Sequence, residues 1–477
     1  MDLRQSPGDR QVAPTGPART EPTPTRHGPV DGARTLAVIG AATLLVLIVF
    51  TTVTTTVGQT AREFGTSVGW QTWALSGMSL GLAAALLTSG SLADRFGRRR
   101  VLSLSMIGLA VFTALGAAAP SMGVFVAARV LQGVAGAGVL SAGLGLIGHT
   151  FPSGPARTHA TGVWSAMLGA GIATGPILGA LLTDWAGWRS SYAAIAIGAA
   201  ALTLAWRALP ETRQPATARR VDLPGALTML VAMSSLTAAL TAGRSGWTSP
   251  TTLTLFTVGL VALAAFTRIE TVRREPMLDL GLLRTPAFLA SVGGAVTTGL
   301  TMIGLMSYSP TLYERGFGYS ALAAGGILSL WSFTSTAVAM QARRLPARWQ
   351  TRGRLVTGLV ACAVGAAALG GLTPGSPWWR LVPGLIVAGV GSGLVNSALA
   401  RLAVESVPHG SASLGSGANN TARYLGSALG IALVVAIVST AGTGHAGLIH
   451  GWNHAALTTA VLSLAGAGLV LAYRPRT

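Results

Sequence analysis

Apolar runs of about 20 residues recur from one end of this chain to the other, and they constrain its fold more than any other feature. A run of this length crosses the hydrocarbon core of a bilayer as an α-helix. The strands of a β-barrel are excluded, because they alternate in polarity over about 10 residues. The runs predict fourteen transmembrane helices, at 35–57, 70–92, 100–119, 122–147, 159–183, 189–208, 223–242, 251–268, 286–312, 321–342, 353–372, 380–402, 413–441 and 454–473. We therefore predict an all-α polytopic membrane protein.

The composition supports this class. Half of the residues are apolar (50%) and only 10% are charged, whereas a soluble protein carries about 25% charged residues. So few charges could not cover the surface of a soluble enzyme of this size. Residues 1–34 are rich in Pro, Thr and Arg and lack any apolar run, so we predict a disordered tail there.

The basic residues predict the orientation. The chain has 33 Lys+Arg against 14 Asp+Glu, and every basic residue is an arginine. With the N-terminus inside, most arginines fall in inner segments, and the outer segments hold only Arg62, Arg189, Arg244, Arg315 and Arg380. This asymmetry predicts a multi-pass protein of the cell membrane with both termini in the cytoplasm. The arginines separate apolar runs and do not cluster with aromatics, so no nucleic-acid partner is expected.

A charged loop occurs twice. LADRFGRRR (92–100) follows the second predicted helix, and LPARWQTRGR (345–354) follows the tenth. Two parallel six-helix repeats are the architecture of transporters whose halves rock against each other. We therefore predict a cytoplasmic tail at 1–34, six-helix bundles at 35–209 and 286–477, and an inserted helix pair with its flanking loops at 210–285.

The first copy of this loop carries a family resemblance. GSLADRFGRRR (90–100) resembles the cytoplasmic loop signature of the major facilitator superfamily, and the wider pattern is similar to its fourteen-helix drug:proton antiporter branch. In that family the loop latches the two halves on the inside. The resemblance assigns this role to Gly90, Asp94, Arg95, Gly97 and Arg98. A solvated loop with one counter-ion is the alternative.

Two arginines lie within predicted helices. AARVLQGVAGAG (127–138) resembles the fourth-helix motif of the family, which implies a role in proton transfer for Arg129, next to Gly133. The alternative is an arginine that snorkels to water near the outer interface. ANNTARYLGSALGIA (418–432) also matches the branch, and Arg423 in it is a candidate cavity or gate residue. The alternative for Arg423 is a cytoplasm-facing position near the start of its helix.

The fifth predicted helix contains GIATGPILGA (171–180), similar to the antiporter motif that marks exporters in the family. Gly171, Gly175 and Gly179 recur every four residues and so share one helix face, which permits close contact with a neighbouring helix. Pro176 frees a backbone carbonyl and permits a kink. Ordinary small-residue packing is the alternative.

The first helix departs from the branch. The acidic residue that relatives carry there is replaced by Val49, their asparagine by Thr54 and their proline by Gly58. The sequence places no acid near the middle of a predicted span. Three possibilities stay open: coupling through Asp94 and Arg129, coupling through an acid at a helix end such as Glu63 or Asp184, or no proton coupling.

These features together predict a secondary active exporter of small amphipathic compounds such as drugs, antibiotics or secondary metabolites, with protons as the candidate coupling ion. The chain is expected to act as a monomer in the bilayer, not as an enzyme, and with no cofactor or metal. A transport-inactive receptor with the same fold is the alternative. The candidate cavity residues are Thr51, Thr54, Thr55, Trp73, Met78, Asn396 and Asn419.

Overall fold

The computed structural model describes residues 29–152, 155–205, 209–210, 223–243, 247–273, 280–342, 350–407, 412–442 and 444–473. These residues form helices and no strand. The helices are α1 (Pro29–Glu63), α2 (Val68–Phe96), α3 (Arg98–Ala117), α4 (Met122–Thr150), α5 (Pro155–Ala186), α6 (Trp188–Thr203), α7 (Leu223–Ala242), α8 (Pro250–Val272), η3 (Leu280–Arg284), α9 (Pro286–Thr298), η4 (Gly299–Ile303), α10 (Gly304–Phe317), α11 (Ala321–Gln341), α12 (Thr351–Ala368), η6 (Trp378–Leu381), α13 (Val382–Glu405), α14 (Ala412–Thr440) and α15 (His445–Ala472).

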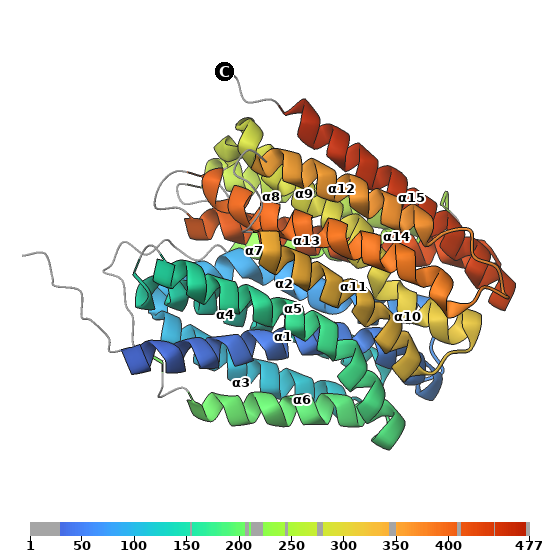
Figure 1. The fold of residues 1–477 in the computed structure, drawn as a ribbon, viewed down its shortest axis with the longest axis horizontal. Coiled ribbons are helices and arrows are strands. Elements are labelled where there is room, and N and C mark those ends of the chain that lie inside the picture. Colours follow the sequence, from blue (N-terminus) through green and yellow to red (C-terminus); the bar gives the residue numbers. More distant parts are fainter. Residues whose placement is uncertain are drawn as a thin grey trace, which may run out of the picture.

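The described residues contain 12 helical stretches that are long and apolar enough to cross a membrane. One of them, Pro286–Phe317, joins α9, the π-helical turn η4 and α10. The shorter helices α6 and α12 run beside them (Figure 1). The prediction of an all-α polytopic membrane protein is confirmed.

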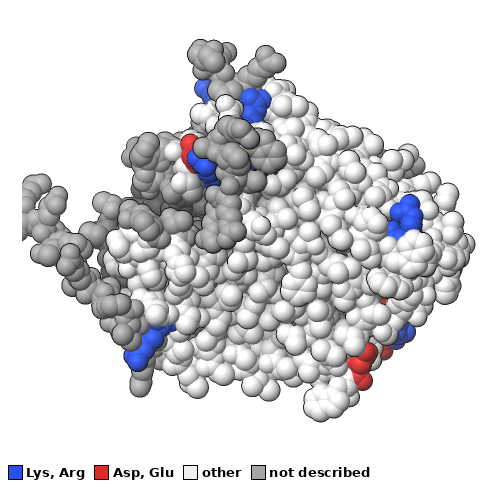
Figure 2. Space-filling view, in the orientation of Figure 1, with Lys and Arg blue, Asp and Glu red and all other residues white. Residues whose placement is uncertain are grey.

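The helices pack in two groups (Figure 1). We call α1 to α6 the N-terminal group and α9 to α15 the C-terminal group. The two groups meet mainly where α2 contacts α14 and where α5 contacts α11. The pair α7 and α8 lies outside both groups, with α7 against α2 and α14. The face shown in Figure 2 is almost free of charged side chains between its two ends.

The outward faces of the peripheral helices are apolar. Large apolar side chains are exposed at helical spacing on α3 (Leu104, Ile107, Val111) and on α15 (Leu457, Val461, Leu464). Exposed apolar stripes of this kind mark a surface that contacts lipid or a partner. On helices that can span a bilayer, lipid is the simplest partner for these apolar stripes.

Glycines let helices touch at their backbones. A Cβ at Gly81 of α2 would lie 2.0 Å from the carbonyl oxygen of Val130 of α4, and one at Gly430 of α14 would lie 2.2 Å from that of Leu300 in η4. Only a residue without a side chain permits such approaches, which drive helix association in membranes. These contacts fix α2 on α4 and α14 on the middle of the α9–α10 segment.

Several predicted boundaries differ from the structure, including the starts of the first and last helices. Residues 29–34 belong to α1 and not to a disordered tail, and a proline such as Pro29 suits the first turn of a helix. The last helix begins at His445, well before the predicted residue 454. Packing explains the extension, because Trp452 is fully buried and its indole N–H donates to the carbonyl oxygen of Leu369 at 2.8 Å. The remainder of the predicted tail, 1–28, lies outside the described residues.

Candidate functional site

Arg129 of α4 is fully buried inside the N-terminal group. Its Nη1 donates to the carbonyl oxygen of Val49 at 2.8 Å and to Oε1 of Gln132 at 2.9 Å. Its Nη2 donates to the carbonyl oxygen of Phe50 at 3.1 Å, and its Nε to that of Ala74 at 3.3 Å. The side chain therefore joins α4 to α1 and α2, and the alternative of an arginine that snorkels to water is wrong.

Close packing of α2 on α4 creates this site. A Cβ at Gly133, one turn after Arg129, would lie 2.2 Å from the carbonyl oxygen of Met78. Met78 is itself fully buried, and its sulfur lies 3.5 Å from Nη1 of Arg129. The predicted cavity residue Met78 and the predicted coupling residues Arg129 and Gly133 thus belong to one cluster.

All recorded partners of the Arg129 guanidinium are neutral. Two of them are the backbone oxygens of Val49 and Phe50, at the turn of α1 where the family resemblance predicts an acidic side chain. A helix carbonyl can accept a second hydrogen bond through its free lone pair. The backbone therefore satisfies the donors of Arg129 but leaves its positive charge in place.

A second arginine lies where the two groups meet. The Arg423 guanidinium on α14 lies 5.4 Å from the ring centroid of Tyr424. That ring packs edge-on against Phe50 of α1, with centroids 5.7 Å apart. One turn further along α14, the Ser427 hydroxyl is 3.1 Å from that of Ser79 on α2. Arg423 therefore belongs to the interface between the two groups, about three turns into α14.

The donors of Arg423 are only partly used. Nη2 donates to Oδ1 of Asn420 at 2.5 Å, on the same helix. Nε is buried and has no hydrogen-bond partner among the described residues. A buried donor without a partner costs about 1–3 kcal/mol. In this conformation Arg423 retains a donor that a further group could satisfy.

The glycine face of α5 packs on α1. A Cβ at Gly175 would lie 2.1 Å from Oγ1 of Thr51, and one at Gly171 would lie 2.6 Å from Cβ of Leu47. At Gly179 a Cβ would lie 2.9 Å from Oγ1 of Thr55. The predicted close contact is therefore one between helices of the same group.

Pro176 is the part of this motif that reaches the other group. Its carbonyl oxygen accepts a bond from Oγ1 of Thr55 at 3.1 Å. The same oxygen would lie 3.0 Å from a Cβ at Gly325 of α11. One turn of α5 therefore contacts both α1 and the C-terminal group.

The other predicted cavity residues do not gather around one space. The hydroxyls of Thr51 and Thr54 donate to backbone oxygens of their own helix, at 2.8 and 2.7 Å. Trp73 packs at the side of α2 that faces α7, and Asn396 is half-buried on α13. Nδ2 of Asn419 donates to the backbone and side-chain oxygens of Ser291 on α9, at 3.1 and 3.0 Å.

The predicted latch is visible in part. Gly97 joins α2 to α3 with φ at +99°, a conformation that favours glycine. Gly90, which the resemblance also assigns to the latch, lies inside α2 and not at this turn. Arg98 packs on α4, where a Cβ at Gly145 would lie 2.9 Å from its Nε, and Arg95 is exposed. The side chain of Asp94 and residues 343–349 of the second copy lie outside the described residues.

Glu314 of α10 is a residue whose position sequence reasoning did not find. Its Oε2 would lie 3.1 Å from a Cβ at Gly58 of α1, and Nη1 of Arg62 would lie 3.8 Å from the same point. Its Oε1 is buried and has no hydrogen-bond partner. The carboxylate therefore lies between the two groups. No local signal marks it, since its neighbour Gly58 is far away in the sequence.

Glu63, by contrast, belongs to a network within one group. Its carboxylate accepts a bond from the indole N–H of Trp188 at 2.5 Å and pairs with Arg189. The backbone N–H of Trp188 donates to Oε1 of Gln59 at 2.8 Å. This network ties α1 to α6 within the N-terminal group.

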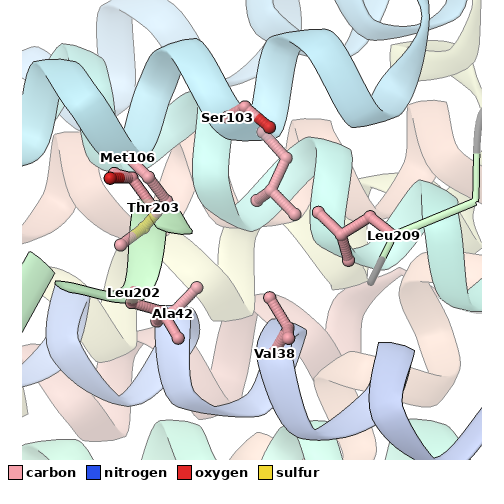
Figure 3. A pocket seen from close by; sticks show the side chains of 8 residues that line it. Val38, Ala42, Ser103, Met106, Leu202, Thr203 and Leu209 are labelled. Carbon is pink, nitrogen blue, oxygen red and sulfur yellow. The ribbon is translucent and has the colours of Figure 1, made fainter. Parts of the chain in front are cut away.

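A shallow apolar hollow in the N-terminal group lies away from these residues (Figure 3). Val38, Ala42, Leu102, Ser103, Met106, Leu202, Thr203 and Leu209 line it. None of them is a predicted cavity residue. The structure instead brings the two groups into contact at several levels, from Glu314 on Gly58 to Gly417, whose Cβ would lie 2.7 Å from Leu87.

No cluster of three or more metal-binding side chains occurs in the part of the chain that the structure describes. His450 and His454, one turn apart on α15, have ring centroids 4.4 Å apart. This is a neighbouring pair that sequence reasoning overlooked. It lies outside the interface between the two groups, since α15 packs within the C-terminal group.

Comparison with known proteins adds four findings. The sequence model of the Major Facilitator Superfamily matches residues 39–431. A puromycin resistance protein of Streptomyces alboniger is 33% identical, over 88% of this chain and 84% of its own length. A multidrug efflux pump of Mycolicibacterium smegmatis is 30% identical, over 96% and 90%. The crystal structure of tetrameric PepTSo2 matches in fold alone, with a TM-score of 0.65, 15% identity and 92% and 98% of the two chains covered.

Proposed function

The chain belongs to the Major Facilitator Superfamily, and we propose that it exports small amphipathic compounds across the cell membrane by alternating access. Relatives of similar length include a protein named for puromycin resistance and a protein named as a multidrug efflux pump. Export of an antibiotic-like compound is therefore the role that the comparisons support. Neither of these names describes an enzyme, and we propose no catalytic activity for this chain.

The observation that carries this proposal is the interface between the two helix groups. It joins α2 to α14 and α5 to α11, and it contains Phe50, Tyr424 and Arg423, while Arg129 donates to the Phe50 carbonyl oxygen from inside the N-terminal group. In transporters built from two repeats, the substrate site lies at the interface of the repeats near mid-bilayer. We propose that 35–209 and 286–477 rock about this interface, with the inserted pair in 210–285 at the side.

We also propose the orientation and the latch. The distribution of the arginines supports cytoplasmic termini, which puts the Gly97 turn on the cytoplasmic side. There, Gly97 permits the tight turn between α2 and α3, and the Arg98 side chain packs on α4 at Gly145. Asp94, with Arg95 beside it, would complete the latch by accepting charge-assisted hydrogen bonds.

For the energy source we propose an acid at a helix end. The carboxylate of Glu314 lies between the two groups, whereas Glu63 pairs with Arg189 inside one group. The charged groups near Glu314 are Arg62, Arg315 and Asp184. Opening this end of the interface would wet the buried Oε1, so protonation would differ between the two states.

Two experiments test these proposals. Inverted membrane vesicles that contain the chain should accumulate members of a panel of amphipathic antibiotics above vesicles that lack it. Binding without accumulation would contradict export and favour the receptor alternative. The absence of both binding and accumulation would also contradict the export proposal. In proteoliposomes, Glu314→Gln should reduce substrate-induced proton release, whereas the exposed Glu405→Gln should not. Equal release by both variants would contradict the role of Glu314.

A further inference from the structure

Two arginines, one in the interface and one beside it, lie on helices without acidic residues. Helices α4 and α14, which hold Arg129 and Arg423, contain no Asp or Glu. The acids of α1 and α2, namely Asp31, Glu63 and Asp94, lie at or near helix ends. A charge in a membrane helix is costly and usually marks a pathway for an ion or substrate, or pairs with a partner.

The two arginines differ in what they can still bind. Every recorded contact of Arg129 is to an oxygen or sulfur of the protein, and the residue is fully buried. Arg423 is only half-buried, its one hydrogen-bonding side-chain partner is Asn420, and its Nε lacks an acceptor. A guanidinium has five N–H donors in a fork that matches a carboxylate. Arg423 is therefore the residue with donors to offer.

Aromatic side chains lie beside the Arg423 guanidinium, and they could pack against the aromatic part of a ligand. Its guanidinium lies over Tyr424, and Tyr424 packs edge-on against Phe50. The backbone at Arg423 touches η4, where a Cβ at Gly299 would lie 2.0 Å from the Arg423 carbonyl oxygen. A π-helical turn inside an α-helical segment frequently marks a functional site.

We propose that Arg423 binds an anionic oxygen of the substrate, and that the exported compounds are amphipathic organic anions with an aromatic body. This inference rests on the proposed export function and narrows its substrate class. A carboxylate or acidic phenolate would pair with the free donors of Arg423, and its rings would pack on Tyr424 and Phe50. Arg129, which donates to the Phe50 carbonyl oxygen, adds positive charge nearby, which discriminates against cations.

The test uses matched compounds in inverted vesicles. Each aromatic scaffold of a panel is supplied as a carboxylate, as its amide and as an amine. The wild type should carry the carboxylates at least about tenfold faster than the amines, a difference of about 1.4 kcal/mol. Equal or faster transport of the amines would overturn the inference and leave the export function intact. If no scaffold moves in any form, the export function fails and the inference fails with it.

Variants of Arg423 test whether this residue causes the preference for carboxylates. Arg423→Gln should lower the carboxylate-to-amide transport ratio about tenfold, and Arg423→Lys, which keeps the charge but loses the fork, should lower it less. Arg401→Gln is the matched control, because Arg401 is exposed and pairs with Glu405 on α13. An unchanged ratio in Arg423→Gln would overturn the inference. Should Arg423→Gln fail to fold, the Arg423→Lys variant and the wild-type comparison of charge forms still decide it.

Discussion

Arg129 and Arg423 approach the same aromatic pair from opposite helix groups, yet their surroundings differ. Arg129 donates to the backbone of Phe50 and to three further oxygens, in a fully buried site. Arg423 lies over Tyr424, bonds Asn420 on its own helix and keeps an unpartnered Nε. One guanidinium is held by its own group, and the other is open toward the interface.

The difference shows how a membrane protein can carry charge for two purposes. A buried cation is tolerated when neutral dipoles satisfy its donors, and it then ties helices together. A conformation in which a buried donor has no acceptor is higher in free energy than one in which the donor is paired. We expect Arg129 to hold the shape of the N-terminal group, and Arg423 to respond to substrate.

The strongest disturbance of this arrangement should come from Gly175→Leu. The new Cβ would lie 2.1 Å from Oγ1 of Thr51 and 2.8 Å from the carbonyl oxygen of Ile48. This is the turn of α1 whose carbonyl oxygens, at Val49 and Phe50, hold Arg129. We expect nearly complete loss of transport at matched protein abundance, because overpacking costs about 1–3 kcal/mol or more and displaces α1.

Gly162→Leu is the control for that variant. Gly162 lies on the same helix, and no heavy atom lies within 4 Å of its Cβ position. It should transport like the wild type. Equal transport by both variants would show that the α1–α5 contact does not position the site.

The next largest effect should come from Arg129→Gln. The variant loses the bonds to the carbonyl oxygens of Val49, Phe50 and Ala74 together. Bonds to charged groups contribute about 1.5–3 kcal/mol each, so we expect a lower melting temperature and slower transport of all charge forms. Arg423→Gln should instead change selectivity and leave the melting temperature nearly unchanged. If Arg129→Gln instead changed charge selectivity and left the melting temperature unchanged, the structural role assigned to Arg129 would be wrong.

The fold could be read from the sequence because its signal is local. Each apolar run predicts its own helix, and the structure follows nearly all of these runs. The start of α15 was missed because tertiary contacts of Trp452 extend the helix into a less apolar segment. Local hydrophobicity cannot report a contact made with a distant loop.

The site could be predicted from the sequence only in part. Residue spacing predicts which residues share a helix face, but not which other helix packs on that face. The Gly171–Gly175–Gly179 face was predicted, but its contact with α1 was not. Thr51 and Thr54 were predicted to line a cavity, yet in the structure their hydroxyls bond carbonyl oxygens of their own helix, which are always within reach.

Val49→Asp tests whether the missing acid sets the charge preference. It would add a carboxylate at the residue whose carbonyl oxygen already binds Arg129. We expect the amine-to-carboxylate transport ratio to rise several-fold, and substrate-induced proton release to increase, because the change adds negative charge and a protonation site together. Val49→Asn, similar in size but uncharged, should do neither. If the wild type already releases one proton or more per substrate, the acid is not the limiting feature.

The smallest effect should come from the hydroxyl pair beside Arg423. Ser79 and Ser427 join the two groups through one neutral hydrogen bond of 3.1 Å, and such a bond contributes about 0.5–1.5 kcal/mol. Ser79→Ala and Ser427→Ala should each slow or speed transport only a few-fold, and the double variant should match either single one, because both remove the same bond. The carboxylate-to-amide ratio should not move, since neither hydroxyl carries charge. A ratio that falls as far as in Arg423→Gln would mean that polarity at this level of the interface, and not the charge of Arg423, selects the substrate.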